Sequence, residues 1–389
     1  MLRFMETSVL ILIVLPSLLI LFYPLCVWLA KRRFRHARRE VDSWPDLSVI
    51  VPVRGLDDGA RENLRSLFSQ NYAGKVEIIF SLEDEQDPAV KVIREIIAEH
   101  SEAESRIVFS GSDKEYRGKI HNLVEALKIS QSEAVMFVDS DVRMTSDDYL
   151  TRFVEPLGYD EVGLVTCYQA VYAAKSLGAG LIALMINADL MGYFSTLFAL
   201  GRLNLANGAI LALRREVVDR IGGLADLRNT ILNDTAVARK VARLSKQIIL
   251  ADRVACVYSQ HSTIVDWWHQ VSRWHIAMRS YMRLPEYAVY GLSRLSLLMA
   301  AVYVVIAPLT VFSIIILTVP LLSRTVSLAL INLFFLRDRS TWSYFGLIYL
   351  LDLGNVLFLL TPFFTRKIVW RGRSYRVGNH ATLEPLETE

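Results

Sequence analysis

Residues 134–141 read Ala-Val-Met-Phe-Val-Asp-Ser-Asp, an apolar run followed at once by two carboxylates, Asp139 and Asp141. A short apolar run bounded by polar residues is typical of a strand that is buried on both faces of a sheet. Two carboxylates one residue apart at the end of such a strand either share a hard divalent cation, which prefers oxygen ligands, or form a strand-terminating Asx turn. This segment therefore predicts a buried strand with an acidic exit.

The same pattern recurs through the middle of the chain, where short β-rich runs alternate with amphipathic helical runs. The expected strands are Leu47–Val53, Val76–Leu82, Ala134–Val138 and Gly163–Val171, and the expected helices are Arg61–Ser69, Asp87–Glu99 and Lys119–Ile129. Strands separated by helices of about 10–15 residues form crossover units and a mostly parallel sheet. Because ligands of such sheets bind beyond the carboxyl ends of the strands, Asp139 and Asp141 lie where a ligand is expected.

The composition of the 389 residues is too apolar for an ordinary soluble enzyme, with 53% hydrophobic and 21% charged residues. Soluble domains average about 45–50% apolar and about 25% charged residues. The net charge of +3 gives no reason to expect a nucleic-acid partner. Cys26, Cys167 and Cys256 lie far apart in the sequence, so neither a disulfide framework nor a zinc site is indicated.

The N-terminal part of the chain predicts a membrane anchor. Ser8–Ala30 is an uncharged run of 23 residues, against about 20 needed to cross the hydrocarbon core. A basic cluster, Lys31–Arg39, comes directly after it. A secretory signal peptide has its positive charges before the apolar run, so this segment is expected to be uncleaved. The positive-inside rule places the basic cluster and the long polar segment after it in the cytoplasm.

Two further membrane spans are expected near the C-terminus. Leu295–Ser323 carries no charge over 29 residues, and Ser340–Thr365 contains a single acid, Asp352. Thr325–Leu336 lies between them and, at 12 residues, is too short to cross, so it is expected to be interfacial or re-entrant. Basic residues come after the last run: Arg366, Lys367, Arg371, Arg373 and Arg376. Both basic clusters then lie on the cytoplasmic side of a multi-pass protein.

These features divide the chain into three parts: an anchor with its basic flank (1–39), a cytoplasmic catalytic domain with interfacial helices (40–285) and a C-terminal transmembrane region with a basic tail (286–389). Within the middle part, Leu177–Leu213 is unusually apolar. It is interrupted by Asn187, Asp189, Arg202, Asn204 and Asn207. We therefore expect it to lie on the membrane surface rather than to span.

Three other polar signals allow a functional and a purely structural interpretation. Glu83–Pro88 follows an expected strand and is either a ligand-binding loop or a solvated loop that starts a helix. Asp234 precedes the helical run Ala236–Leu244 and is either a reactive carboxylate or an N-cap. Gln270–Trp274, within an aromatic-rich amphipathic helix, either anchors that helix at the interface or binds a diphosphate or an acceptor headgroup.

Taken in order, these residues resemble the D…DxD…D…QxxRW pattern of inverting, GT-A-type (family 2-like) glycosyltransferases, and the chain is most similar to ceramide glucosyltransferases. The pattern is carried by Asp84, Asp139-Ser140-Asp141, Asp234 and Gln270-Val271-Ser272-Arg273-Trp274. Segments Leu82–Ala89, Lys119–Leu123 and Trp370–Arg376 are also similar to that family. The resemblance implies a Rossmann-like, mostly parallel catalytic sheet between transmembrane helices.

The resemblance also implies roles for the acidic residues. Asp84 would hold the nucleotide near its base and ribose, and Asp139 and Asp141 would bind its diphosphate through Mg²⁺ or Mn²⁺. Asp141 stands where ceramide glucosyltransferases often lack a second acid, which favours metal binding. Asp234 would be the general base for the acceptor hydroxyl, although position 233 is Asn where many members carry an acid.

The basic and aromatic residues of the pattern receive roles in the same way. Lys119 would be a further phosphate contact, and Arg273 would also contact the nucleotide sugar. Gln270 and Trp274, with Arg273, would line the diphosphate and acceptor side. A metal ion and an arginine absorb the negative charge of a leaving diphosphate, and a single in-line displacement needs one base. The chemistry of these residue types therefore fits the resemblance.

We therefore hypothesise a membrane-embedded inverting enzyme that transfers a sugar from a UDP-sugar to the hydroxyl of a membrane lipid, with ceramide as the expected acceptor. The sequence does not decide between glucose, galactose and glucuronate. Three alternatives stay open: the same chemistry on a hopanoid or polyprenyl phosphate, a processive polysaccharide synthase, and a membrane-anchored binding protein without catalysis. Three expected spans provide little wall for a polysaccharide channel.

Overall fold

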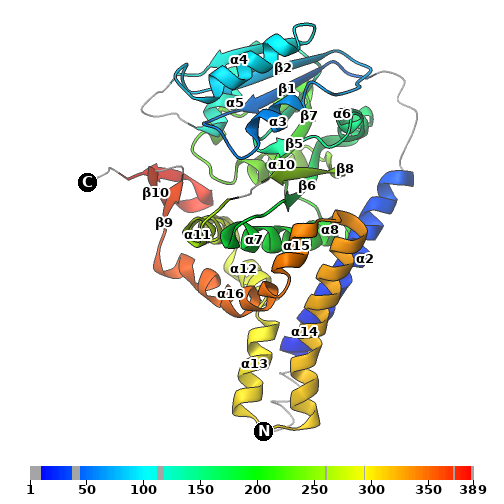
Figure 1. The fold of residues 1–389 in the computed structure, drawn as a ribbon, viewed down its shortest axis with the longest axis vertical. Helices are drawn as coiled ribbons and strands as arrows, with labels where there is room; N and C mark the ends of the chain where they lie inside the picture. Colours follow the sequence, from blue (N-terminus) through cyan, green and yellow to red (C-terminus); the bar gives the residue numbers. More distant parts are fainter. Residues whose placement is uncertain are drawn as a thin grey trace. The chain divides into compact units, whose positions relative to one another are not determined.

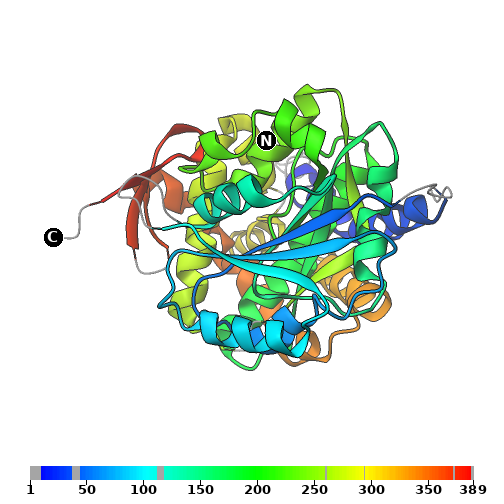
Figure 2. The same ribbon diagram turned by 90° about the horizontal axis from the view of Figure 1, so that it is seen from above.

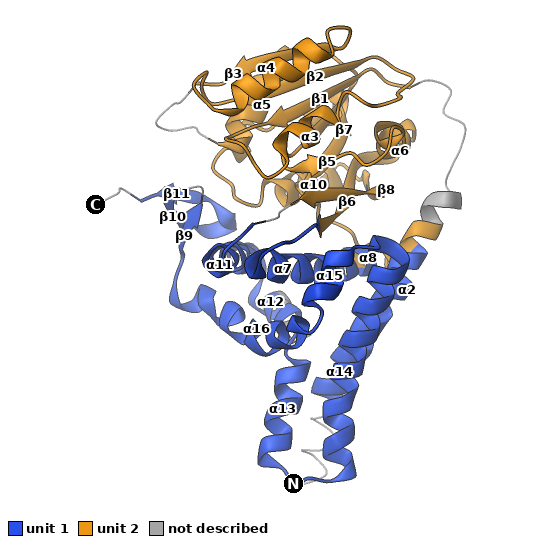
Figure 3. Cartoon of the chain, viewed as in Figure 1, with its two compact units in different colours: residues 1–29, 172–196, 260–389 blue, residues 30–171, 197–259 orange. Residues whose placement is uncertain are grey.

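The computed structural model describes residues 10–36, 44–111, 118–258, 261–292, 294–370 and 373–386. Part of the expected basic flank (37–39) and Arg371 of the expected basic tail lie outside these ranges. The chain forms two compact units (Figure 3). Unit 1 comprises residues 1–29, 172–196 and 260–389, and unit 2 comprises residues 30–171 and 197–259. Residues 172–196 and 260–285 thus belong to the same compact unit as the apolar terminal helices.

Unit 2 is built on an eight-stranded sheet with the order β3-β2-β1-β4-β7-β6-β8-β5. The strands are β1 (Leu47–Pro52), β2 (Val76–Leu82), β3 (Glu104–Phe109), β4 (Ala134–Val138), β5 (Val142–Arg143), β6 (Val162–Tyr172), β7 (Ile210–Arg214) and β8 (Gln247–Tyr258). Strands β3, β2, β1 and β4 are parallel, whereas β7 pairs antiparallel with both β4 and β6. The α/β prediction is confirmed, and four predicted strands are found within a few residues of their expected ends.

The helices of unit 2 cover both faces of this sheet. They are α3 (Ala60–Arg65), α4 (Ala89–Glu99), α5 (Lys119–Ile129), α6 (Tyr149–Val154), α9 (Arg215–Arg220) and α10 (Asn233–Arg243). The chain moves outward from β1 through β2 to β3 and then returns to β4, so right-handed crossovers place α5 on the face opposite to α3 and α4. Figures 1 and 2 show this arrangement. Salt bridges from Arg61 to Glu95 and Glu99 join α3 to α4.

The core of unit 2 lies between the sheet and its helices. Ile50, Ile79 and Phe137 from β1, β2 and β4 pack against Leu123 of α5 and Val237 of α10, and all five are buried. The central strands β1 and β4 are apolar at nearly every position because both of their faces are covered, whereas the edge strand β3 carries Glu104, Ser105 and Arg106. This rigid core holds the loops that leave the carboxyl ends of β1, β2 and β4 at one edge of the sheet.

Unit 1 is mainly helical. Its elements are η1 (Leu10–Val14), α2 (Leu15–His36, whose last turns belong to unit 2), α7 (Leu177–Leu184), η3 (Met185–Leu190), α8 (Met191–Ala199, which also ends in unit 2), α11 (Ile264–Tyr281), α12 (Leu284–Leu292), α13 (Ser296–Ile306), α14 (Val311–Ile331), η5 (Asn332–Leu336), α15 (Arg339–Tyr344) and α16 (Leu347–Phe364). Four helical stretches of the described chain are long and apolar enough to cross a membrane: Ile11–Arg32, Leu177–Ala199, Val311–Leu336 and Leu347–Phe364. The predicted N-terminal span is found as a helix over its described residues. The predicted span Ser340–Thr365 is found as two helices, α15 and α16, of which α16 is long and apolar enough to cross.

The expected single span Leu295–Ser323 is wrong, because the chain forms two helices there, α13 and α14. Pro308 lies between them and lacks the N–H that a continuous helix needs. The side chain of Thr310 then caps α14 by accepting a hydrogen bond from the Ser313 N–H at 3.2 Å. The prediction that Thr325–Leu336 is a separate interfacial or re-entrant segment is also wrong, since α14 continues through these residues into η5.

Two of the polar residues that interrupt Leu177–Leu213 are held inside unit 1. Asn187 and Asp189 are buried inside unit 1 rather than exposed. Both carboxylate oxygens of Asp189 accept hydrogen bonds from Arg324 of α14. Leu177–Ala199 is long and apolar enough to cross a membrane. A helix can carry paired polar groups at membrane depth, and the expectation that this segment lies on the membrane surface stays a prediction.

The C-terminal tail forms a three-stranded antiparallel sheet that the sequence analysis missed. Its strands are β9 (Lys367–Trp370), β10 (Arg373–Val377) and β11 (Leu383–Pro385), in the order β11-β10-β9. Burial alternates along β9, where Lys367 and Val369 are exposed and Ile368 is buried, but the run Ile368–Trp370 is uniformly apolar, so the sequence does not display this period. Ile368 and Val377 are buried, and β9 and β10 contact α11 within unit 1.

Candidate active site

The loops after β1, β2 and β4 lie at one edge of the unit 2 sheet, because these strands are parallel. Asp84, in the loop after β2, is exposed, and its Oδ1 accepts a hydrogen bond from the Gln86 N–H at 2.6 Å. Asp87 has a structural role, because it accepts hydrogen bonds from the N–H groups of Gly55 (2.9 Å) and Ala89 (2.9 Å). It thus ties the β1 loop to the start of α4 and leaves Asp84 at the open edge.

Asp139, directly after β4, is held by a lysine from a neighbouring helix. Lys119 is the first residue of α5, and its Nζ lies 2.6 Å from Asp139 Oδ1. The same Nζ donates to the carbonyl oxygen of Gly208 at 2.8 Å. The Asp139 N–H in turn donates to the carbonyl oxygen of Ala209 at 2.9 Å. Lys119 and Asp139 thus share contacts with the segment that leads into β7.

Asp234 also lies close to Gly208, in the segment that leads into β7. It lies in the first turn of α10, and its Oδ1 accepts a hydrogen bond from the Thr235 N–H at 2.7 Å. A Cβ atom at position 208 would lie 2.9 Å from Asp234 Oδ2, so only glycine allows this approach. The structure therefore brings together Lys119, Asp139 and Asp234, three of the predicted site residues, around Gly208.

The surroundings of Asp234 change its acidity. Burial raises the pKa of the Asp234 carboxyl above its usual range, and the negative charge of Asp139 acts in the same direction. Hydrogen bonds from the backbone of Thr235 and Gly208, and the positive charge of Lys119, act against this rise in pKa without cancelling it. A carboxylate with a raised pKa is a stronger base, which suits proton abstraction from a hydroxyl.

The segment from Asp139 to Val142 forms a tight turn whose closure does not use the Asp139 carboxylate. The Val142 N–H donates to the carbonyl oxygen of Asp139 at 3.1 Å, and Ser140 Oγ donates to Asp57 Oδ2 at 3.0 Å. Asp139 and Asp141 are both partly exposed residues, although the Oδ1 atom of Asp141 is buried. The segment can therefore form a turn at the end of β4 and still offer carboxylate oxygens to a cation.

The donor set at this turn fits a divalent cation that shares its ligands with a substrate. In the described part of the chain no three His, Cys, Asp or Glu side chains group as a metal cage. Magnesium in phosphate-transferring sites commonly takes one or two carboxylates and completes its shell with water and substrate phosphates. Asp139 and Asp141 provide such a pair of oxygen ligands.

Gln270, Arg273 and Trp274 belong to unit 1, where α11 carries all three as half-buried side chains. α11 begins with a capping box in which Thr263 and Asp266 exchange hydrogen bonds, as expected at a helix start. The Arg273 guanidinium lies over the ring of Trp370 in β9, 5.6 Å from its centroid. This cation–π contact keeps the guanidinium group against an aromatic surface.

Two contributors to the site, Asn207 and Gly208, escaped the sequence analysis. Asn207 is buried, its Oδ1 accepts from the Ala209 N–H at 2.9 Å, and its Nδ2 donates to Gln169 at 3.2 Å. These bonds hold Gly208 where Lys119 meets it. Asn-Gly between two apolar runs is a turn signal, and it could have marked this segment as more than a polar interruption of Leu177–Leu213.

The chain matches the family described as "Glycosyl transferase family 21" over residues 9–383. It is 24% identical to "Ceramide glucosyltransferase 3" of Caenorhabditis elegans over 66% of this chain and 56% of that protein. It is 22% identical to "Ceramide glucosyltransferase 1" of the same organism over 69% of this chain and 58% of that protein. The chain thus spans just over half the length of these relatives.

A solved structure shows the same fold. The mannosyltransferase PcManGT from Pyrobaculum calidifontis, in complex with GDP-Man and Mn²⁺, aligns with a TM-score of 0.51 at 19% identity and covers 87% of this chain and 98% of that one. The expected GT-A architecture is confirmed by this likeness. With a family match over nearly its whole length, the chain belongs to glycosyl transferase family 21.

Proposed function

We propose that this chain is an inverting glycosyltransferase that moves a sugar from a UDP-sugar to the primary hydroxyl of ceramide in the membrane. The observation that carries the proposal is the convergence of Lys119, Asp139 and Asp234 on Gly208. The names of the two relatives support the ceramide acceptor. The apolar helices of unit 1 support a lipid rather than a soluble acceptor.

In this proposal Asp234 acts as the general base. The acceptor hydroxyl attacks the anomeric carbon, its proton passes to the Asp234 carboxylate, and the bond from the anomeric carbon to the UDP oxygen breaks. One displacement inverts the anomeric centre and needs a single base. The raised pKa of Asp234 makes the carboxylate a better proton acceptor than an exposed aspartate.

The residues at the ends of β2 and β4 and the first residue of α5 would hold the donor. Asp139 and Asp141 would bind Mg²⁺ or Mn²⁺, which stabilises the negative charge of the departing diphosphate when bound. When the donor enters, Lys119 would exchange its contact with the Asp139 carboxylate for a contact with a phosphate oxygen, because both groups are negatively charged. Asp84, exposed at the same sheet edge, would contact the base or ribose.

The motif on α11 would serve the diphosphate and acceptor side of the reaction. Arg273 would neutralise charge on the leaving group, and Gln270 and Trp274 would bind polar and apolar parts of the substrates. The three-part organisation with boundaries at residues 39 and 285 and a cytoplasmic catalytic domain stays part of the proposal. It rests on the basic residues that follow the first and last apolar helices.

The test uses the full chain in native membranes with labelled UDP-glucose, UDP-galactose and UDP-glucuronate. Ceramide, a hopanoid and a polyprenyl phosphate are supplied as separate acceptors, and release of UDP and labelled lipid are both measured. Asp234→Asn serves as the inactive control. A labelled hopanoid or polyprenyl product would replace ceramide as the acceptor, and a growing polysaccharide would indicate a synthase. Release of no UDP with any acceptor would contradict the enzyme proposal.

A further inference from the structure

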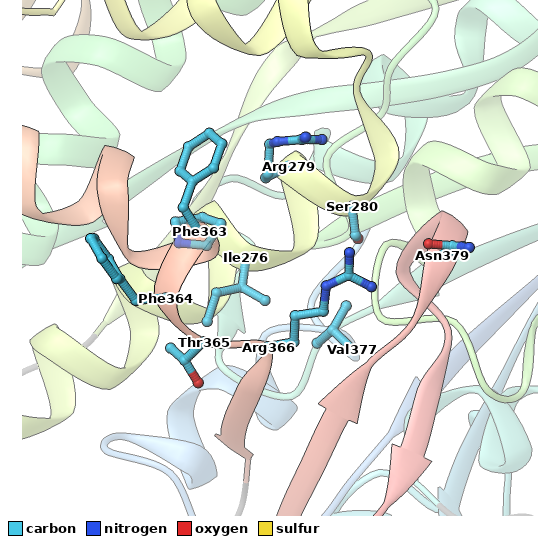
Figure 4. Close-up of a pocket in the computed structure, with 10 residues that line it drawn as sticks. Ile276, Arg279, Ser280, Phe363, Phe364, Thr365, Arg366, Val377 and Asn379 are labelled. Carbon is cyan, nitrogen blue, oxygen red and sulfur yellow. The ribbon is translucent and has the colours of Figure 1, made fainter.

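A pocket in unit 1 lies apart from the residues assigned above. It has a volume of about 320 Å³, which falls within the range of about 300–1,000 Å³ usual for ligand sites. Its wall comes from three places: the last turns of α11, the end of α16 with the two residues after it, and the turn after β10. The lining residues are Ile276, Arg279, Ser280, Pro362, Phe363, Phe364, Thr365, Arg366, Val377 and Asn379 (Figure 4).

Two arginines give this pocket a positive charge, and none of its ten lining residues is acidic. The Nε atom of Arg279 is buried and has no hydrogen-bond partner among the described residues. A buried donor without an acceptor is costly, and Arg279 lines the pocket, so an anion toward which its guanidinium turned would offset this cost. Figure 4 shows the guanidinium of Arg366 directed to the same side of the pocket as Ser280. The site thus presents convergent donors to an anion.

The opposite side of the pocket is aromatic. Phe363 lies against Arg279, with the guanidinium carbon 5.4 Å from the ring centroid. Phe363 and Phe364 are 55% and 84% exposed, although both end a helix that is long and apolar enough to cross a membrane. Exposed apolar rings at the end of such a helix are suited to contact with acyl chains, and basic pockets beside transmembrane helices bind anionic headgroups.

The backbone around the pocket is fixed without a ligand. The Val377 N–H donates to the carbonyl oxygen of Arg366 at 2.8 Å, and the Lys367 N–H donates to Thr365 Oγ1 at 3.0 Å. These bonds join the end of α16 to the C-terminal sheet. The arginines are therefore presented on a preformed wall, which lowers the entropic cost of binding.

We propose that this pocket binds a phosphate ester, with Arg279 and Arg366 as its cationic partners. The exposed phenylalanines favour an anionic phospholipid, whose acyl chains would lie along Phe363 and Phe364, over a soluble phosphate. The site serves binding and is separate from the residues proposed for sugar transfer, so its test does not depend on the acceptor of the reaction.

The test measures lipid binding to the full chain in nanodiscs. Discs of phosphatidylcholine alone and discs containing phosphatidylglycerol are compared, and lipids that stay bound after delipidation are counted by native mass spectrometry. We expect retained phosphatidylglycerol but not phosphatidylcholine. In Arg279→Gln/Arg366→Gln the affinity should fall by roughly 100-fold, about ten-fold for each charge-assisted contact.

Lys367→Gln is the matched control, because Lys367 is exposed, basic and next to Arg366 but does not line the pocket. It should retain the lipid as the parent does. If the double variant does not fold, Asn379→Glu provides a second test, since an acid at this exposed lining position should repel a phosphate and release the lipid.

A competition experiment distinguishes a soluble phosphate ester from an anionic phospholipid as the ligand. Free glycerol 1-phosphate that displaces the lipid at equal concentration would assign the site to a soluble phosphate ester, and weak displacement would assign it to the lipid. Equal retention of phosphatidylglycerol by the parent and by both pocket variants would overturn the proposal. So would equal retention of phosphatidylcholine and phosphatidylglycerol by the parent protein.

Discussion

The Nζ atom of Lys119 lies 2.6 Å from Oδ1 of Asp139, at the point where α5 starts and β4 ends. The same Nζ also donates to the carbonyl oxygen of Gly208 at 2.8 Å. A lysine between a carboxylate and a backbone carbonyl can exchange one anionic partner for another without losing its position. This relationship makes Lys119 a sensitive probe of donor binding.

Lys119→Met should weaken binding of the UDP-sugar more than it slows the reaction of bound substrate. A charge-assisted hydrogen bond contributes about 1.5–3 kcal/mol, so KM for the donor should rise roughly 10- to 100-fold. Steady-state kinetics with varied UDP-sugar measures this. Lys128→Met, an exposed position on the same helix, should leave KM unchanged. An unchanged KM in Lys119→Met would remove the lysine from the donor site.

Asp234→Asn should abolish most of the activity, because an amide does not accept the hydroxyl proton. Loss of a general base lowers the rate by about 10²–10⁴-fold. Asp219→Asn, an exposed aspartate on α9, is the control and should retain full activity. Transfer of labelled sugar to lipid is the measurement. Activity of Asp234→Asn within a few-fold of the parent would assign the base elsewhere.

The raised pKa of Asp234 also predicts a pH dependence. The base works only when ionised, so kcat/KM should fall as the pH drops through the pKa of Asp234, and this acidic limb should lie above the 3.8 of an unperturbed aspartate. An aspartate whose pKa is higher in the folded protein than in the unfolded chain disfavours folding when it is ionised. This unfavourable contribution to the free energy of unfolding is lost as the pH falls and the carboxyl becomes protonated. Asp234→Asn should therefore melt at or above the parent temperature at pH 7, measured by thermal unfolding in detergent. A clear drop in melting temperature would contradict this.

Gly208→Ala tests the close approach between two parts of the site. The added methyl group would lie 2.9 Å from Asp234 Oδ2, so the carboxylate must move. Displacement of a catalytic group by about 1 Å costs about 100-fold in rate. Gly346→Ala is the control, since a Cβ there meets no atom within 4 Å. Both variants should insert into membranes equally, and only Gly208→Ala should lose turnover.

The fold was largely predictable from local pattern. The apolar strands 76–82 and 134–138 and the helix 119–129 were found with their predicted bounds, because strand and helix periodicities are local properties. The break between α13 and α14 was missed, since an apolar composition without charges looks the same whether the chain is one span or a helical hairpin. The tail strands were missed because their charges suggested only a basic flank.

The acidic residues of the site were predictable from the sequence, but the residues that hold them in place were not. Asp139 and Asp234 stood out as carboxylates at the ends of elements, and Lys119 was identified only through the resemblance. The sequence separates Lys119 from Gly208 by 89 positions, and nothing local indicates that they meet. Asn207 likewise acts through bonds to the distant Gln169, which only the folded chain reveals.

The pairing of the charges in the apolar segments is likewise not visible in the sequence. Asp352 was recognised as a lone acid, but its partner was not. Arg324 Nε donates to Asp352 Oδ2 at 2.6 Å, and Arg324 also donates to Asp189. All three side chains are buried. The group therefore joins α14 to α16 and to the helix that carries Asp189.

Arg324→Met should destabilise the protein by about 3–5 kcal/mol, because it leaves the buried carboxylate of Asp352 without its cation and leaves Asp189 with Arg294, whose Nη1 lies 3.7 Å from Asp189 Oδ2. Adding Asp352→Asn to this variant should restore much of the loss, since the Arg324–Asp352 pair is then replaced by two neutral groups while Asp189 keeps Arg294. Arg339→Met, an exposed position in α15, is the control and should change little. Thermal unfolding of the purified protein in detergent provides the comparison. If Arg324→Met/Asp352→Asn is as unstable as Arg324→Met, the loss comes from packing of the arginine stem rather than from its charge, and the ion group does not hold these helices together.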